Sequence, residues 1–120
     1  MRFNGVSHTV AQYGKLDIFF ANAGIGGGFR LESISSETFM RTMKVNSLSV
    51  FLAIKYASEA MKKHGSGGSI IATASVAGLR AGAGGSDYSA SKAAVINLVQ
   101  TSSWQLAGTN IRGIHGSGIA

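Results

Sequence analysis

The chain contains no cysteine and no proline, and only five of its 120 residues are acidic. Without cysteine it can form neither disulfides nor a metal site built on thiolates. Its three histidines are widely spaced, with no acid at ligand distance, so we expect no metal site. The longest apolar stretches, 50–54 and 70–74, are far too short to cross a bilayer. Residues 1–6 lack the apolar core of a signal peptide, so we expect a cytoplasmic protein without membrane contact.

The shortage of acids leaves a net charge of +6 and a pI near 10.1. Such a charge raises the question of nucleic-acid binding. The basic residues are scattered, however, and only Lys62 and Lys63 are adjacent, with no aromatic residues interleaved. We therefore interpret the charge as a modest preference for anionic ligands and expect no nucleic-acid partner.

Glycine is abundant, with 17 residues. The glycines cluster at 24–28, 65–68, 78–85 and 113–118, between segments with regular patterns, as loop glycines do. With 45% hydrophobic residues, the chain can bury the core of one small domain. We expect residues 1–120 to form that single domain.

Three segments are predicted to be strands: 16–24, 69–75 and 111–115. The first is nearly continuous in apolar residues, which is typical of a strand buried on both faces in a parallel sheet. The order of strands and helices calls for right-handed crossovers. The sequence thus predicts a partial doubly wound, Rossmann-like parallel α/β sheet with about three strands and two long helices.

Helices are predicted over 6–13, 36–64 and 86–106. Gly14 closes the first as a C-terminal cap, and Ser35 caps the start of the second. Apolar residues of the long second helix fall on one face at or near helical spacing. They are Phe39, Met43, Val50, Ile54, Ala57 and Met61.

Polar residues follow the first two predicted strands. Asn22 ends the first, Ser75 ends the second, and Tyr88 begins the helix that comes after it. Because ligands of such sheets bind beyond the carboxyl ends of the strands, these groups are predicted to converge on one rim. A serine at a strand end is also a common turn former. Asn46, in the middle of the long helix, is either an exposed position or an amide directed into the cleft.

Tyr88 and Lys92 are four residues apart, so they lie one above the other on the same face of a helix. An unperturbed phenol titrates near ~10 and is a poor base at neutral pH. A cation within a few Å favours the phenolate, so the phenol can exchange a proton near neutral pH. The same spacing is common on ordinary helix faces, and it indicates chemistry only together with the other groups on the rim.

Taken in order, four features resemble the short-chain dehydrogenases/reductases, over about residues 10–112. They are Ala21-Asn-Ala-Gly24, for the Asn-Asn-Ala-Gly of that family, then Asn46, Ser75 and the Tyr88-x-x-x-Lys92 motif. The interval between Ser75 and Tyr88 also fits the family.

The resemblance implies an NAD(P)-dependent oxidoreductase that interconverts a small-molecule alcohol and a ketone. Tyr88 would be the general acid/base, and Lys92 would assist it and bind the nicotinamide ribose. Ser75 would hold the substrate oxygen, and Asn46 would place a water in a proton relay through Lys92.

Asn22, Ala23 and Gly24 would line the cofactor, NAD or NADP, beside Tyr88 and Lys92. In the family, the two long helices commonly form the subunit interface. The resemblance therefore implies a homo-oligomer for the full-length form.

The sequence also departs from the family pattern. No glycine-rich phosphate turn precedes Asn22, and the loop 24–28 is not a substitute, because Phe29 occupies its sixth position. Residues 113–118 contain no Pro-Gly turn. We therefore expect a chain truncated at both ends, which holds the second half of the family fold and lacks the first βα unit and the C-terminal substrate region. Residues 16–22 would then form an exposed apolar edge.

An alternative follows from these departures. The chain would be a catalytically inactive fragment that acts, if at all, as an interaction module through its two long helices.

Overall fold

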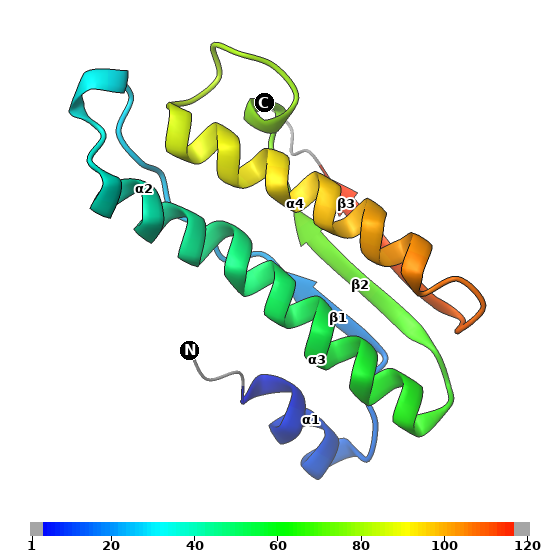
Figure 1. Cartoon of the computed structure of the whole chain (residues 1–120). Coiled ribbons are helices and arrows are strands. Elements are labelled where there is room, and N and C mark those ends of the chain that lie inside the picture. The colour runs from blue at the N-terminus through cyan, green and yellow to red at the C-terminus, as the bar shows by residue number, and fades with distance from the viewer. Residues whose placement is uncertain (1–3, 117–120) are drawn as a thin grey trace.

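The computed structural model describes residues 4–116, which form a parallel sheet with helices on one of its faces (Figure 1). The elements are α1 (Gly5–Tyr13), β1 (Ile18–Ala21), α2 (Ser36–Met43), α3 (Ser49–His64), β2 (Gly68–Thr73), α4 (Ser86–Gln105) and β3 (Ile111–Gly116). Two short 3-10 turns, Leu31–Ser33 and Val76–Gly78, lie in the connections. The predicted order of strands and helices is confirmed.

The strands lie in the order β1-β2-β3, and both neighbouring pairs are parallel. Their register sets Phe20 beside Ile71, and Ile71 beside Ile114. Helices α3 and α4 run side by side in front of the sheet, with α1 on the outer side of α3 (Figure 1). A partial Rossmann-like sheet with two long helices is therefore present, as predicted.

The core lies between the sheet and the helices α3 and α4. Its fully or nearly fully buried apolar side chains include Val50, Ala57, Met61, Ile70, Ala72, Val95 and Val99. Each helix contributes residues spaced three or four apart, which is the periodicity of a half-buried helix. Within residues 4–116, no helix is both long enough and apolar enough to span a bilayer.

The other face of the sheet is open in the described part of the chain. Successive side chains of a strand point to opposite faces, and Ile18 and Phe20 are 64% and 58% exposed. The prediction that this strand is buried on both faces is therefore wrong for residues 4–116, because helices cover only one face. The predicted exposed apolar edge is confirmed in part: β1 is an edge strand of the described sheet and exposes Ile18 and Phe20, but Leu16 is buried.

The long helical segment 36–64 is interrupted by a π-helical turn, Lys44–Leu48, between α2 and α3. Its ends match the prediction: Ser35 Oγ accepts a hydrogen bond from Thr38 N at 3.1 Å, and Gly65 ends it with φ of 71°. The predicted single regular helix needs correction at its centre. π turns of this kind often occur at functional sites.

Candidate active site

The carboxyl ends of β1 and β2 are joined by side-chain hydrogen bonds. Thr73, the last residue of β2, donates from Oγ1 to Asn22 Oδ1 at 2.7 Å. The carbonyl oxygen of Thr73 accepts a hydrogen bond from Lys92 Nζ at 3.1 Å. At the rim predicted from the sequence, Asn22 is therefore bonded to the side chain of Thr73, and Lys92 to its main chain.

Asn46 lies in the π turn and is completely buried, so its interpretation as an exposed helix position is wrong. Its Oδ1 atom accepts from Ile25 N at 2.8 Å, and Nδ2 donates to Ile25 O at 2.8 Å. Nδ2 also donates to Ser91 Oγ at 3.0 Å. The amide thus fixes the loop after β1 against α4, and both of its N–H groups are used.

Lys92 is only 4% exposed, and burial lowers the pKa of its ammonium group below the ordinary value for lysine. Its Nζ atom lies 5.8 Å from the centre of the Tyr88 ring, as the four-residue spacing predicts. A Cβ atom built on Gly24 would lie 3.3 Å from Lys92 Nζ and 3.4 Å from Asn46 Oδ1. Gly24, the amine and the amide therefore meet at one point.

Ser75 is half-buried and begins the 3-10 turn Val76–Gly78. Its Oγ atom accepts a hydrogen bond from Ala77 N at 3.1 Å, so it does form a turn. A Cβ atom on Gly84 would lie 2.9 Å from Tyr88 Cδ1 and 3.4 Å from Ala77 Cβ. The Tyr88 ring and the turn that Ser75 opens therefore both lie beside Gly84.

Ser91 is a site residue that sequence reasoning missed. It is completely buried, and Oγ donates to the carbonyl oxygen of Tyr88 at 2.7 Å while accepting from Asn46. Its own carbonyl oxygen accepts from Ser47 Oγ at 2.8 Å. The available signal was a serine inside a helix, where serine is unfavourable unless its hydroxyl bonds to the backbone.

These groups gather near the carboxyl ends of β1 and β2. They are a buried amine with two further N–H donors, a half-buried phenol, an amide that fixes the loop 24–28, and a serine hydroxyl. An amine of this kind can donate hydrogen bonds to acceptor atoms of a ligand. The phenol beside it suits proton transfer.

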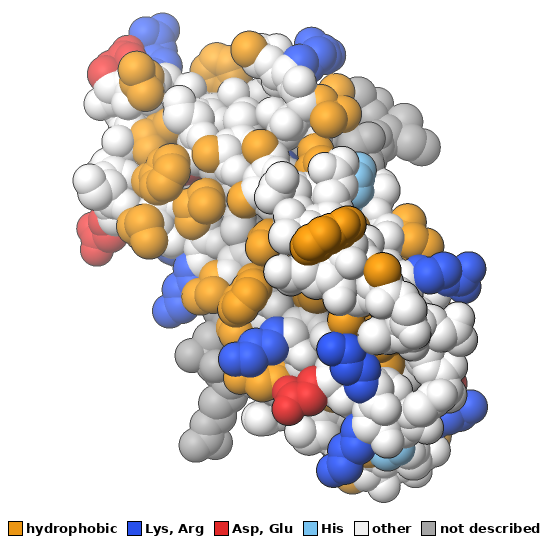
Figure 2. Space-filling view, turned by 45° about the vertical axis from the view of Figure 1, so that its right-hand side comes forward, with side chains coloured by type: hydrophobic (Ala, Val, Ile, Leu, Met, Phe, Trp, Pro, Cys, Tyr) orange, Lys and Arg blue, Asp and Glu red, His pale blue; other side chains and the backbone are white. Residues whose placement is uncertain are grey.

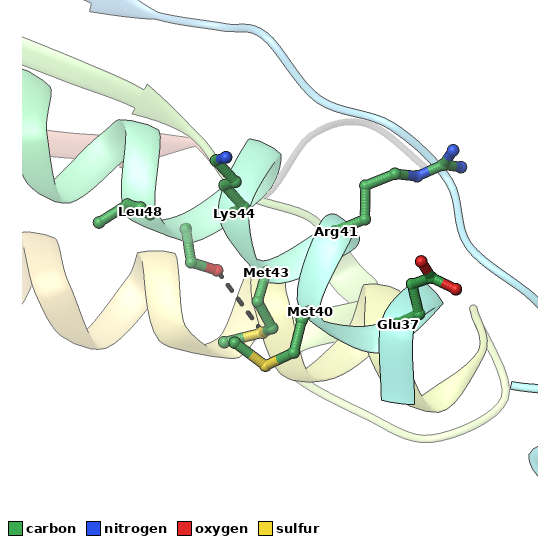
Figure 3. A pocket seen from close by; sticks show the side chains of 7 residues that line it. Glu37, Met40, Arg41, Met43, Lys44 and Leu48 are labelled. Carbon is green, nitrogen blue, oxygen red and sulfur yellow. Dashed lines mark hydrogen bonds between the residues drawn. The ribbon is translucent and has the colours of Figure 1, made fainter. Parts of the chain in front are cut away.

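A separate apolar groove of about 640 Å³ lies on the outer side of α2 and the π turn. Figure 3 shows Met40 and Met43 with their sulfur atoms close together, and Leu48 further along the helix. Hydrophobic side chains gather at the end of the molecule that carries α2, beside exposed Lys and Arg residues (Figure 2). None of the groups on the rim lines this groove, so it is distinct from the candidate active site.

A parallel sheet with helices on one face, and a Tyr–Lys pair, an amide and a glycine loop near its carboxyl edge, make this a partial Rossmann-like domain. Residues 3–115 match the family described as short chain dehydrogenase. The chain belongs to this short-chain dehydrogenase/reductase family.

Two curated relatives illustrate the match. The chain is 42% identical to short-chain dehydrogenase reductase 3a of Arabidopsis thaliana, over 91% of this chain and 43% of that protein. It is 35% identical to L-rhamnose-1-dehydrogenase of Scheffersomyces stipitis, over 89% of this chain and 42% of the relative.

Solved structures agree with the sequence match. A short chain dehydrogenase from Mycobacterium smegmatis superposes with a TM-score of 0.86 at 32% identity, over 96% of this chain and 49% of that one. These relatives are named as dehydrogenases or reductases. The chain spans less than half the length of each of them.

Proposed function

We propose that this chain carries the catalytic residues of an NAD(P)-dependent oxidoreductase that interconverts an alcohol and a ketone. The observation that carries the proposal is the buried Lys92 amine, 5.8 Å from the ring of Tyr88 and beside the loop that Asn46 holds. Residues with these spacings lie at the sheet edge where ligands of α/β folds bind.

Tyr88 would exchange the proton with the substrate. In reduction, its hydroxyl would donate a proton to the ketone oxygen. In oxidation, the phenolate takes the proton of the alcohol. Lys92 would assist the exchange from its place beside the ring, with Nζ 5.8 Å from the ring centre.

Ser75 and Asn46 would have supporting roles. Ser75 Oγ accepts from Ala77 N, so the hydrogen of its own hydroxyl can be donated to a substrate oxygen. Asn46 Oδ1 and Lys92 Nζ lie within 3.4 Å of one point beside Gly24, and a water bridging them would extend the proton relay.

The residues fit a nicotinamide cofactor, NAD or NADP, which supplies the hydride when bound. Lys92 keeps two N–H groups for the ribose hydroxyls after its bond to Thr73. Asn22 and Ala23 line a shallow hollow at the end of β1. Gly24 has no side chain to fill the space beside the amine.

We further propose that residues 1–120 form a single partial NAD(P)-binding domain that corresponds to the second half of the family fold. The glycine-rich turn that holds the cofactor phosphates in relatives has no counterpart in this sequence. The substrate is proposed to be a small-molecule alcohol or ketone.

The longer form of the protein is proposed to be a homo-oligomer that associates through its helices. A stripe along the helical segment, at intervals of four and three residues, lines both the groove beside α2 and a second groove beside α4. It consists of Lys44, Leu48, Phe51, Lys55, Ser58 and Lys62. A strictly monomeric full-length protein in light scattering would contradict this proposal.

The function is tested in a full-length form that contains this chain. Tyr88→Phe removes only the hydroxyl, so turnover should fall by ~10²-fold or more. Tyr56→Phe is the matched control, because Tyr56 lies on α3, away from the strand ends. Retained turnover in Tyr88→Phe would contradict the proposed role.

A further inference from the structure

Asp87 precedes Tyr88 directly, in the first turn of α4, and its side chain is completely buried. Its Oδ2 atom accepts a hydrogen bond from Thr42 Oγ1 of α2 at 2.8 Å, and Thr42 is also completely buried. Its Oδ1 atom is buried and accepts no hydrogen bond from any residue between 4 and 116. One buried bond therefore joins residues 45 positions apart in the sequence.

A buried carboxylate is costly unless its surroundings favour the charge. The start of a helix does so, since the N–H groups of the first turn lack intrahelical partners and carry partial positive charge. Gly85 is the N-cap of α4, so Asp87 lies within that turn. Yet no N–H group of residues 4–116 donates to its Oδ1 atom, and an apolar residue would fill the same space without a buried polar atom left unpaired.

The glycine loop after β1 packs directly on this carboxylate. A Cβ atom on Gly27 would lie 1.5 Å from Asp87 Oδ2. A Cβ atom on Gly85 would lie 1.9 Å from the carbonyl oxygen of Gly28, so the backbone of the loop touches the start of α4. The same loop is held at its other end by the bonds between Ile25 and Asn46.

We propose that Asp87 is a positioning residue for the reaction proposed above. It fastens α2 and the loop 24–28 to the first turn of α4, and so sets where the Tyr88 phenol stands relative to Lys92 and Gly24. The proposal rests on the proposed function for the role of Tyr88. Its structural part, a clamp between Thr42, Asp87 and the loop, can be measured independently of that function.

The test follows the environment of Tyr88 directly. The chain has three tyrosines, and Tyr13 and Tyr56 are exposed, so a Tyr13→Phe/Tyr56→Phe background labelled with fluorotyrosine reports residue 88 alone by ¹⁹F NMR. Thr42→Val and Asp87→Ala break the bond in this background, and Thr42→Ser keeps a hydroxyl. The matched control is Glu37→Gln, an exposed acid in the first turn of α2.

Amide hydrogen exchange in the segments 24–28 and 86–90 is measured on the same variants at Ile25 and Ser89, whose N–H groups donate to Asn46 Oδ1 and to the carbonyl oxygen of Gly85. Thr42→Val and Asp87→Ala should shift or split the ¹⁹F resonance and speed exchange in both segments by about tenfold, since a buried polar group loses its partner. Thr42→Ser should restore both signals, and Glu37→Gln should change neither. Where Asp87→Ala does not fold, Thr42→Val, which replaces one hydroxyl by a methyl group, carries the test.

Unchanged resonance and exchange in both folded variants would overturn the proposal. A rise in exchange spread evenly over α3 and β2 would also overturn it, because that is global destabilisation without a clamp. Neither readout needs cofactor or turnover, so this failure is distinguishable from a failure of the Tyr88→Phe test.

Discussion

Lys92 Nζ donates a hydrogen bond to the carbonyl oxygen of Thr73 at 3.1 Å, and so ties the start of α4 to the carboxyl end of β2. The hydroxyl of the same threonine reaches Asn22 at the end of β1. The amine of the candidate site is therefore placed by main-chain geometry, and its position depends on the sheet rather than on a loop. Such rigid support is what a site needs for preorganised chemistry.

Replacing Lys92 should change how stability depends on pH. Burial lowers the pKa of Lys92 in the folded state, so the unfolded chain binds more protons between that pKa and the unfolded value near ~10.4. The free energy of unfolding therefore gains a contribution that rises with pH in this window. In Lys92→Met this rise should be absent.

Urea unfolding followed by circular dichroism at several pH values from neutral to alkaline measures this difference. Lys62→Met, at an exposed position of α3, is the control and should run parallel to the wild type. A Lys92→Met curve that also runs parallel to the wild type would show that burial of the amine has no such effect.

Asn46→Leu should destabilise the fold by about 3 kcal/mol, because three buried polar partners on Ile25 and Ser91 lose their hydrogen bonds. Asn97→Leu, an exposed asparagine on α4, should change stability by less than about 0.5 kcal/mol. Urea midpoints give both values. Equal effects of the two substitutions would contradict a structural role for the buried amide.

Gly27→Ala should cost about 1–3 kcal/mol, because the new methyl group overlaps the completely buried Asp87 carboxylate. Gly26→Ala is the matched control, since nothing lies within 4 Å of a Cβ atom there. Combining Gly27→Ala with Asp87→Ala should relieve part of the overlap. Equal urea midpoints for the two single variants would contradict the close packing of the loop on α4.

The isolated chain should bind NADH and NADPH weakly, because no glycine-rich turn is present to hold the cofactor phosphates. Trp104 is the only tryptophan, and it lies twelve residues beyond Lys92 on α4, ~18 Å along the helix. Titration that follows energy transfer from Trp104 to the reduced nicotinamide tests this. Micromolar affinity would show the prediction to be wrong.

The fold was largely predictable because its signals are local. Apolar strands, a serine cap at Ser35 and glycine stops at Gly14 and Gly65 each act within a few residues, and all appear in the structure. The rim was predictable for the same reason, since the ends of parallel strands meet at one edge. The exposure of one sheet face could not be predicted in this way. Whether Phe20 is covered depends on which elements pack against that face, and its neighbours in sequence do not determine this.

The internal contacts of the site were also beyond local reasoning. The bond between Thr42 and Asp87 joins two helices that are far apart in the sequence. The bonds of Asn46 to Ile25 and Ser91 depend on a π turn, which no residue spacing in the sequence predicts. Asn46 and Ser91 are both unfavourable helix-interior residues on propensity alone. Their pairing removes that disadvantage for both.

The π turn also rotates the side-chain directions of α3 about the helix axis relative to those of α2. A regular helix rotates by about 100° per residue, and a turn that accommodates one extra residue offsets everything beyond it by about that angle. Asn46 can therefore point inward to the loop while Val50, Ile54 and Ala57 still face the sheet. Deleting a single residue between 44 and 48 would remove this offset, so the Asn46 amide could no longer reach the loop while the apolar residues of α3 kept their places in the core.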